Sequence, residues 1–391
     1  MDSKASGLGL AQVLRRHGPA YLATHPLSLA KAKVWRAILA CRTAALGGHV
    51  QTCDACGTTR HVYHSCRNRH CPLCQTRAKE AWLAARRREV LPVPYFHLVF
   101  TLPHDLNGLI GACPRTLYET LFGAVLATLT EFAANPRWLG GTAAFTLVLH
   151  TWGQDLARHV HIHALMPGGA LKANGDWVAA KRGFLFPVKA LSKLYRGKFI
   201  DALGLAHQSG RLQEAGLTQQ AWNDLAARVH RHDWVVYAKA SLGGPEQVLD
   251  YLGRYTHRVA ICNERILDIG AQTVSVRVRD RTQGNRKRTL SLAAQTFIER
   301  FLLHVLPKGF KRIRHYGLLG PAHKAVHLGA ARAALDAPVP DPLLIESIQA
   351  FMCRIDRHAY LRCPHCAGGQ FVPSAPIVPV PIPLLHLRGP P

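Results

Sequence analysis

Long apolar runs are missing from this chain of 391 residues. No stretch approaches the roughly 20 consecutive apolar residues that a membrane-spanning helix needs, so we expect no transmembrane segment. The first ten residues, MDSKASGLGL, lack the cationic start and long apolar stretch of a secretory signal. These absences disfavour a secreted or membrane-spanning protein and favour a cytoplasmic one, in which cysteines stay reduced.

Acidic side chains are scarce. Asp and Glu number 23 against 49 Lys and Arg, so the formal net charge is +26 and the sequence pI is about 10.2. An excess of this size favours a polyanionic partner, either nucleic acid or an anionic membrane surface. Hydrophobic residues make up 48% of the chain, which supplies a sizeable core and excludes a wholly disordered chain. At roughly 150 residues per domain, the length predicts two or three domains.

Apolar strands alternate with helical stretches from about residue 95 to 300, and the first 45 residues have a helical pattern. This alternation predicts an α/β or α+β domain. Strands are expected at 95–102, 144–151, 160–166, 234–240, 265–269, 273–279 and 288–292, and helices at 117–133, 189–205, 246–257 and 295–305.

Two CxxC pairs stand in a polar, arginine-rich stretch between residues 49 and 78. Cys53 and Cys56 form the first pair, and Cys71 and Cys74 form the second. Four thiolates at this separation fit a tetrahedral structural zinc site, and metal binding would fold a segment that has no core of its own. Ordinary buried thiols are the alternative. The choice of ligands stays ambiguous because further donors lie inside the loop: His61, His64, Cys66 and His70.

A second group of metal-ligand residues stands near the end of the sequence. Its members are Cys353, His358, Cys363 and Cys366, with His365 inside the last pair. Their spacing allows another zinc site, and the alternative is an isolated CxxC that completes nothing. The last 20 residues or so are rich in proline and predict an extended tail.

The sequence HVHIH begins at His159. Side chains alternate between the faces of a strand, so His159, His161 and His163 share one face. Imidazoles side by side form a ready site for a divalent metal, and a purely structural role is the alternative. The sequence has no HExxH pair, so a zinc protease is not supported. On a basic protein the better substrate is a phosphodiester, which a metal would polarise for attack.

Two tyrosines stand four residues apart in a segment of helical pattern that begins at Glu246. Tyr251 and Tyr255 would share one face of that helix. A phenol with a pKa near 10 is a poor nucleophile at neutral pH, so a nearby metal, Arg254 or His257 would have to help. Core packing is the alternative. Beside a histidine strand in so basic a chain, we interpret the pair as candidate nucleophiles.

Cationic side chains follow one face of a predicted strand. In residues 273–281, three valines alternate with Ser275, Arg277 and Arg279, which gives one apolar and one cationic face. A merely solvated face is the alternative for any single arginine. The candidate DNA-binding residues are Arg67, Arg69, Arg254, Arg258, Arg277, Arg279, Lys311 and Arg312. We expect DNA affinity to fall steeply with salt, because each neutralised phosphate releases counterions.

Four stretches together resemble the transposases of the insertion-sequence-ninety-one family. They are SCRNRHCPLCQ (65–75), TWGQDLARHVHIHALMPGG (151–169), YLGRYTHRVAI (251–261) and LPKGFKRIRHYGLL (306–319). The stretches stand in the family's order across most of the chain. The family consists of HUH-type tyrosine enzymes, named for a His–hydrophobe–His motif, that move DNA by a rolling-circle-like route.

The resemblance implies an α+β fold whose central antiparallel sheet is of the HUH nuclease type, similar to RRM and ferredoxin-like domains, with a small N-terminal zinc-binding module. It implies a helical, zinc-binding and DNA-contacting region over 1–90, the tyrosine nuclease over 91–330, and a C-terminal region over 331–391 that ends in the Pro-rich tail. In this arrangement Zn²⁺ is structural.

The resemblance also implies the site residues. The HUH pair is His161 and His163, which would bind Mg²⁺ or Mn²⁺, and the nucleophiles are Tyr251 and Tyr255. HUH enzymes usually have a third polar ligand, for which Gln154 is the first candidate and His159 the second. Both third-ligand candidates come from the resemblance, because spacing alone does not select a third ligand.

The implied reaction nicks single-stranded transposon ends and target DNA. A tyrosine attacks the scissile phosphate and leaves a free 3′-OH and a 5′-phosphotyrosine, which keeps the bond energy for rejoining. No ATP is then needed, in agreement with a sequence that has no GxxxxGKS or GxxxxGKT loop. The protein would work in the cytoplasm at the nucleoid, without a membrane partner. The alternatives are an HUH relaxase or replication initiator, and a non-catalytic zinc-dependent DNA-binding protein.

Overall fold

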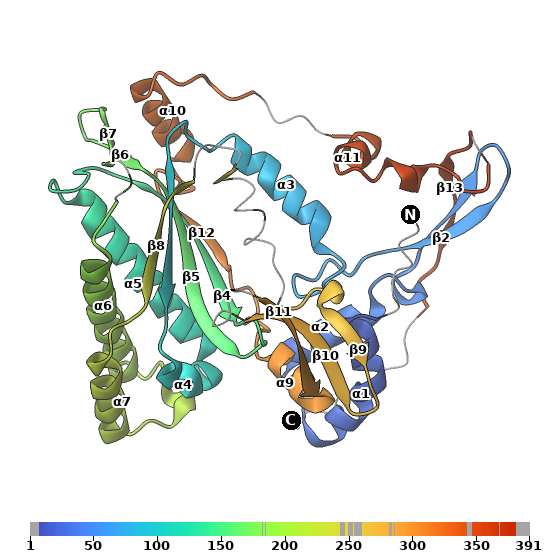
Figure 1. The fold of residues 1–391 in the computed structure, drawn as a ribbon, viewed down its shortest axis with the longest axis horizontal. Helices are drawn as coiled ribbons and strands as arrows, with labels where there is room; N and C mark the ends of the chain where they lie inside the picture. The colour runs from blue at the N-terminus through green and yellow to red at the C-terminus, as the bar shows by residue number, and fades with distance from the viewer. Residues whose placement is uncertain are drawn as a thin grey trace. The chain divides into compact units, whose positions relative to one another are not determined.

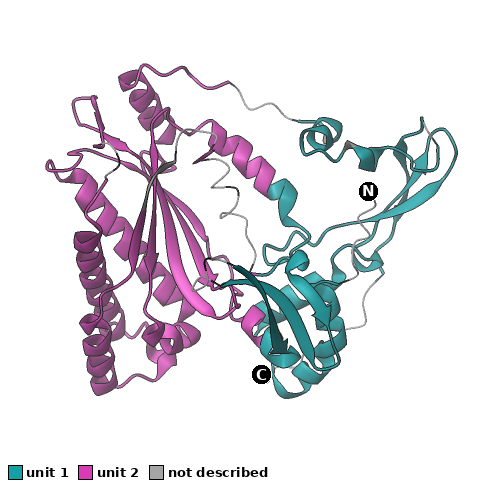
Figure 2. Ribbon diagram, viewed as in Figure 1, with its two compact units in different colours: residues 1–78, 261–298, 342–391 teal, residues 79–260, 299–341 magenta. Residues whose placement is uncertain are grey.

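The computed structural model describes residues 8–380 apart from 182, 184, 243–246, 249–252, 254–259, 281–283, 285, 342–345 and 367. The chain forms two compact units, each assembled from distant parts of the sequence (Figure 2). Unit 1 contains residues 1–78, 261–298 and 342–391, and unit 2 contains residues 79–260 and 299–341. The three consecutive regions expected from the sequence therefore differ from the units, because the chain returns to unit 1 twice.

Unit 2 is built on a five-stranded sheet with every neighbouring pair antiparallel (Figure 1). In spatial order its strands are β12 (Ile313–Gly317), β4 (Ala144–Trp152), β5 (Arg158–Pro167), β3 (Tyr95–Thr101) and β8 (Val236–Leu242). Each of the four strands expected in this part of the chain is present, displaced by at most two residues at either end. The expected α+β class with a central antiparallel sheet is confirmed.

One face of this sheet is covered by helices α5 (Pro114–Ala134) and α6 (Val188–Gln208), as Figure 1 shows. The even-numbered side chains of β5, among them Val160 and Ile162, point into the core between sheet and helices. Helix α5 buries Leu117, Leu121 and other side chains that recur at a spacing of four residues. Each fully buried leucine stabilises the fold by about 1.5–3 kcal/mol. The opposite face of β5 is left for its odd-numbered residues.

Unit 2 contains further helices and short strands besides this sheet and its two covering helices. They are η2 (His104–Leu106), α4 (Asn107–Ala112), β6 (Gly169–Leu171), β7 (Trp177–Ala179), η3 (Gln213–Ala215), α7 (Gln219–Arg231) and α10 (Lys324–Ala334). Two helices begin in the sequence of unit 1 and end in that of unit 2: α3 (Gln75–Arg87) and α9 (Ala294–Leu302).

Unit 1 contains two three-stranded sheets and several short helices. The first sheet has the order β13 (Phe371–Ile377), β1 (Gly48–Cys53) and β2 (Thr59–Tyr63). The second has the order β11 (Arg286–Ala293), β10 (Thr273–Asp280) and β9 (Ile266–Ile269). The helices are α1 (Leu10–Thr24), α2 (Leu29–Ala40), η1 (Ala44–Leu46), η4 (Asn263–Arg265), α11 (Ile348–Arg354) and η5 (His358–Leu361).

The first residues of the proline-rich end expected to be an extended tail form strand β13, whereas residues 381–391 lie outside the described residues. Strand β13 pairs antiparallel with β1, and Phe371 stands opposite Cys53. Proline has no backbone N–H to donate to a ladder, so it is confined to edge strands. Pro373 and Pro376 satisfy this rule because β13 is an edge strand of its sheet. The prolines leave pairing with β1 possible and block pairing on the outer side.

None of the described helices is both long enough and apolar enough to cross a lipid bilayer.

Candidate functional site

Three imidazoles gather on the sheet face of unit 2 that lies opposite α5 and α6. Nitrogen atoms of His150, His161 and His163 all lie within 4.8 Å of one another. His150 of β4 stands directly opposite His161 of β5 in the register, so the two side chains leave the same face. His163 follows two residues later on β5 and therefore shares that face. The three residues form what we call the histidine cluster.

Hydrogen bonds fix the orientation of two of these rings. The Nδ1 atom of His161 lies 2.9 Å from the carbonyl oxygen of His159. A carbonyl can only accept, so Nδ1 of His161 donates this bond and Nε2 is the ring nitrogen turned toward His163. That Nε2 atom lies 3.1 Å from Nε2 of His163, whose Nδ1 in turn lies 2.9 Å from Nε2 of His97. Outer hydrogen bonds of this kind hold metal-ligating histidines in place.

The donor set of the histidine cluster suits a divalent transition ion. Neutral imidazole is a common ligand for transition metals, whereas Mg²⁺ prefers oxygen ligands. Of the two ions expected from the sequence, Mn²⁺ therefore fits three nitrogen donors better than Mg²⁺. Bound there, such an ion would keep open positions for oxygens of a substrate.

The sequence alone does not reveal His150, the third member of the histidine cluster. Gln154, the first candidate, lies in the turn between β4 and β5. His159, the second, has its ring centroid 4.9 Å from that of His161, but its nitrogens are not among the three that gather. His150 was overlooked because only the register of β4 against β5 places it beside His161.

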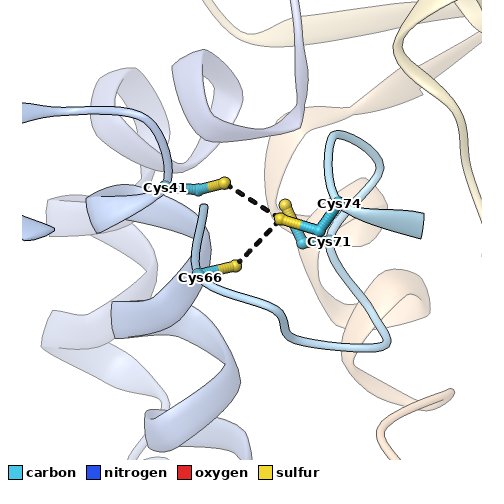
Figure 3. A group of neighbouring side chains, drawn as sticks. All are labelled: Cys41, Cys66, Cys71 and Cys74. Atoms are coloured by element: carbon cyan, nitrogen blue, oxygen red, sulfur yellow. Dashed lines mark hydrogen bonds between the residues drawn. The ribbon is translucent and has the colours of Figure 1, made fainter. Parts of the chain in front are cut away.

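Four cysteines of unit 1 form a first thiol cluster, Cys41, Cys66, Cys71 and Cys74 (Figure 3). Its sulfurs lie 3.2 Å apart between Cys41 and Cys74 and 3.5 Å apart between Cys66 and Cys74. A disulfide would need about 2.05 Å, whereas sulfurs around a tetrahedral zinc with bonds of about 2.3 Å stand about 3.8 Å apart. The spacing therefore excludes disulfides and approaches that of a zinc site.

The thiols of the first cluster affect one another's ionisation. Hydrogen bonds from Cys66 and Cys71 lower the pKa of Cys41 to about 2, while the bond to Cys41 raises the pKa of Cys66 to about 12. The pKa of Cys71 is raised for the same reason. One thiolate thus opposes ionisation of its neighbours, and a divalent ion is what allows several to ionise together.

The expected ligand set of Cys53, Cys56, Cys71 and Cys74 is corrected by the structure. Cys71 and Cys74 belong to the first thiol cluster, whereas Cys53 and Cys56 lie with Cys363 and Cys366 in a second one. Strand β2 lies between the two CxxC pairs in the chain, and each pair finds partners elsewhere in unit 1. Of the expected C-terminal group, Cys363 and Cys366 belong to this second cluster, whereas Cys353 is exposed and outside both clusters; the side chain of His358 lies outside the described ones.

The candidate nucleophiles Tyr251 and Tyr255 lie outside the described residues, as do Arg254 and Arg258. The chain before them is placed on the face of the histidine cluster. Val248 is fully buried in one apolar group with Tyr95 and Leu165, which leave that same face of β3 and β5.

The other candidate DNA-binding residues differ in exposure. Arg67, Arg277, Arg279 and Lys311 are exposed, and Arg69 is half-buried. Arg312 is only 8% exposed, which leaves little of its side chain for a phosphate. The alternation expected over 273–279 is confirmed, since the valines of β10 are buried while Arg277 and Arg279 face outward. On the neighbouring strand, Lys287 stands opposite Arg279 and is exposed too.

The fold and these clusters define an α+β protein with two thiol clusters and a histidine cluster, each of which could hold a metal ion. Residues 144–326 match the family described as "Putative transposase", and residues 13–102 match the "Transposase zinc-binding domain". The chain is 44% identical over 377 residues to "Putative transposase y4qJ" of Sinorhizobium fredii (strain NBRC 101917 / NGR234), covering 94% of this chain and 95% of that protein. The chain belongs to the IS91 family of transposases.

Two more distant similarities were found. The "Transposase for insertion sequence element IS801" of Pseudomonas savastanoi pv. phaseolicola is 28% identical over 314 residues, covering 78% of this chain and 74% of that protein. Among solved structures, the conjugative relaxase TrwC in complex with OriT DNA matches 62% of this chain and 73% of its own, with 13% identity and a TM-score of 0.24. A structural likeness that weak carries no argument about this chain.

Proposed function

We propose that this protein is a transposase that nicks and rejoins single-stranded DNA through a 5′-phosphotyrosine intermediate. The observation that carries the proposal is the histidine cluster, which lies within the segment matched to the transposase family. Val248, three residues before Tyr251, is buried on the same sheet face. The proposal thus has a metal-ligand set and a candidate nucleophile in one segment of the chain.

The histidine cluster would hold the catalytic ion, which supplies polarisation of the scissile phosphate. The protein's own contribution is orientation. The carbonyl of His159 fixes the ring of His161, and His97 fixes the ring of His163, so both Nε2 atoms face one point. This preorganisation avoids a rearrangement of the ligands when the phosphate arrives.

The covalent steps balance without an external energy source. The phenol of Tyr251 or Tyr255 gives up its proton as its oxygen attacks phosphorus, the P–O3′ bond breaks, and the DNA 3′ oxygen takes up a proton and leaves as a hydroxyl. In rejoining, a DNA 3′-hydroxyl attacks the phosphotyrosine and the tyrosine leaves with its proton restored. The second tyrosine can repeat the attack on the target strand.

Two further features support DNA as the substrate. The net charge of +26 supplies a strong field for phosphates. Arg277 and Arg279 add a cationic strip on the exposed face of β10, beside Lys287 of β11. We propose that this strip holds the DNA backbone and that the first thiol cluster, Cys41, Cys66, Cys71 and Cys74, is a structural zinc site.

The test is a nicking assay on labelled single-stranded oligonucleotides from the ends of the protein's own element. With Mn²⁺ the parent should cut at one phosphate and leave a 3′-OH, and EDTA should abolish cutting. A His161→Ala plus His163→Ala variant should lose the activity, whereas His230→Ala, an exposed histidine on α7, should keep it. Binding without cutting on any end sequence would favour the non-catalytic DNA-binding alternative.

A further inference from the structure

The second thiol cluster joins two ends of the chain. Cys53 and Cys56 lie around the turn of the β1–β2 hairpin, and Cys363 and Cys366 lie just before β13. The Sγ atom of Cys53 is 3.6 Å from that of Cys366, and the Sγ atom of Cys56 is 3.7 Å from that of Cys363. These separations exceed a disulfide bond and lie close to the edge of about 3.8 Å in a tetrahedral zinc thiolate site.

The backbone around these sulfurs is shaped to receive them. The N–H of His365 donates to the Sγ atom of Cys363 at 3.4 Å, a bond that stabilises a thiolate. A Cβ on Gly369 would lie 2.2 Å from the Sγ of Cys53 and 2.8 Å from that of Cys366, so only glycine lets the chain pass this close. The chain at Gly369 thus packs directly against two of the four sulfurs.

Outer contacts tie the same two segments together. The N–H of Gln370 donates to Oδ1 of Asp54 at 2.8 Å, and the N–H of Asp54 donates to the carbonyl of Gln370 at 3.0 Å. The guanidinium of Arg60 lies 3.9 Å from the ring centroid of Phe371 and donates to the carbonyl of Tyr360. The two segments that carry the four sulfurs are thus held together by contacts outside the thiol cluster.

We propose that Cys53, Cys56, Cys363 and Cys366 bind a second structural zinc ion, which fastens the C-terminal strand β13 to the N-terminal hairpin. The zinc-binding domain matched by the family ends at residue 102, so half of this ligand set lies outside it. Among the described residues, this site shares no ligand with the histidine cluster. Eight of the eleven cysteines are then zinc ligands.

Metal counting on full-length protein tests this. Zinc and iron are measured by elemental mass spectrometry in a His161→Ala plus His163→Ala background, so that zinc on the histidine cluster does not add to the count. Two zinc ions per chain and no iron are expected. Cys363→Ser plus Cys366→Ser should lower the count to one, Cys66→Ser plus Cys74→Ser should also lower it to one, and Cys353→Ser should leave two. One zinc in the background protein, or iron in its place, overturns the proposal.

A second measurement needs no substitution, so it does not depend on the variants folding. The parent is alkylated under a phosphine reductant, before and after chelation, and each cysteine is followed by peptide mass spectrometry. Cys56 and Cys353 are both exposed, but only Cys56 belongs to a cluster. Cys353 should react at once and Cys56 only after chelation. Equal reaction of the two in zinc-replete protein overturns the proposal.

Discussion

The Nε2 atom of His97 lies 2.9 Å from the Nδ1 atom of His163, and both side chains are buried. This hydrogen bond holds the Nδ1 edge of the His163 ring toward His97. The ring of His163 is therefore turned so that Nε2 meets that of His161. His97 is a positioning residue for the histidine cluster.

Replacing His97 by alanine should weaken divalent metal binding by about 10- to 100-fold, the usual effect of losing an outer hydrogen bond to a metal ligand. Titration of Mn²⁺ into metal-free protein measures this affinity. His97→Gln keeps a polar group that can hydrogen-bond Nδ1 of His163 and should recover part of the loss. Equal loss in both variants would show that His97 acts only through packing.

The identity of the third ligand is testable by a direct contrast. His150→Ala should weaken Mn²⁺ binding more than Gln154→Ala, because His150 places a nitrogen within 4.8 Å of those of His161 and His163. The same titration compares the two variants. A larger effect of Gln154→Ala would return the third ligand to the turn between β4 and β5.

The cationic strip on β10 and β11 predicts a change in salt dependence. Replacing Arg277, Arg279 and Lys287 by alanine should make the slope of log affinity against log salt for single-stranded DNA less negative by about 2. Each lost phosphate contact accounts for about 0.7. Changing the two arginines to lysine keeps the charge and should preserve the slope. Fluorescence anisotropy at several salt concentrations gives both values, and an unchanged slope in the alanine variant would remove the strip from the DNA interface.

Gly369 offers a sharp probe of the second thiol cluster. A methyl group there meets the Sγ of Cys53, whereas one on Gly368 meets nothing within 4 Å. Gly369→Ala should therefore lose the second zinc at a lower chelator concentration than the parent, and Gly368→Ala should behave as the parent does. Zinc release to a colorimetric chelator follows both. Matching release from the two variants would contradict the close approach at Gly369.

Two buried histidines predict acid sensitivity. Burial lowers the pKa of His304 to about 4, and burial together with Arg86 lowers the pKa of His315 to about 4. The unfolded chain has an ordinary pKa near 6.5, so it binds more protons and stability falls as the pH drops from about 6.5 to 4. For His304, 2% exposed, the loss is about 3 kcal/mol. Urea unfolding at pH 7 and pH 5 should show a smaller shift for His304→Gln than for the parent, and equal shifts would exclude His304 as the source.

Much of the sheet could be predicted from the sequence, because the evidence is local. Alternation in HVHIH placed His161 and His163 on one face and their neighbours in the core, as β5 shows. His150 could not be found in this way, since its place beside His161 depends on which residues of β4 and β5 stand opposite each other.

The sequence also could not predict which cysteines share a thiol cluster, because the partners are far apart in the chain. Four CxxC sulfurs look interchangeable in a sequence, and nothing local pairs Cys53 with Cys366, 313 residues away. Composition predicts an extended proline-rich tail, but it cannot show that the first part of this segment forms β13. A strand with two prolines becomes possible only once an edge position is known.

The covalent intermediate is the central claim, and an adduct assay tests it most directly. The protein is mixed with labelled single-stranded element ends and Mn²⁺, denatured in SDS and digested for peptide mass spectrometry. The account predicts a Mn²⁺-dependent adduct that survives SDS, carries its nucleotide on Tyr251 or Tyr255, and is lost in the Tyr251→Phe plus Tyr255→Phe variant. Cut DNA without an adduct, or an adduct that persists in the double variant, would contradict the tyrosine mechanism.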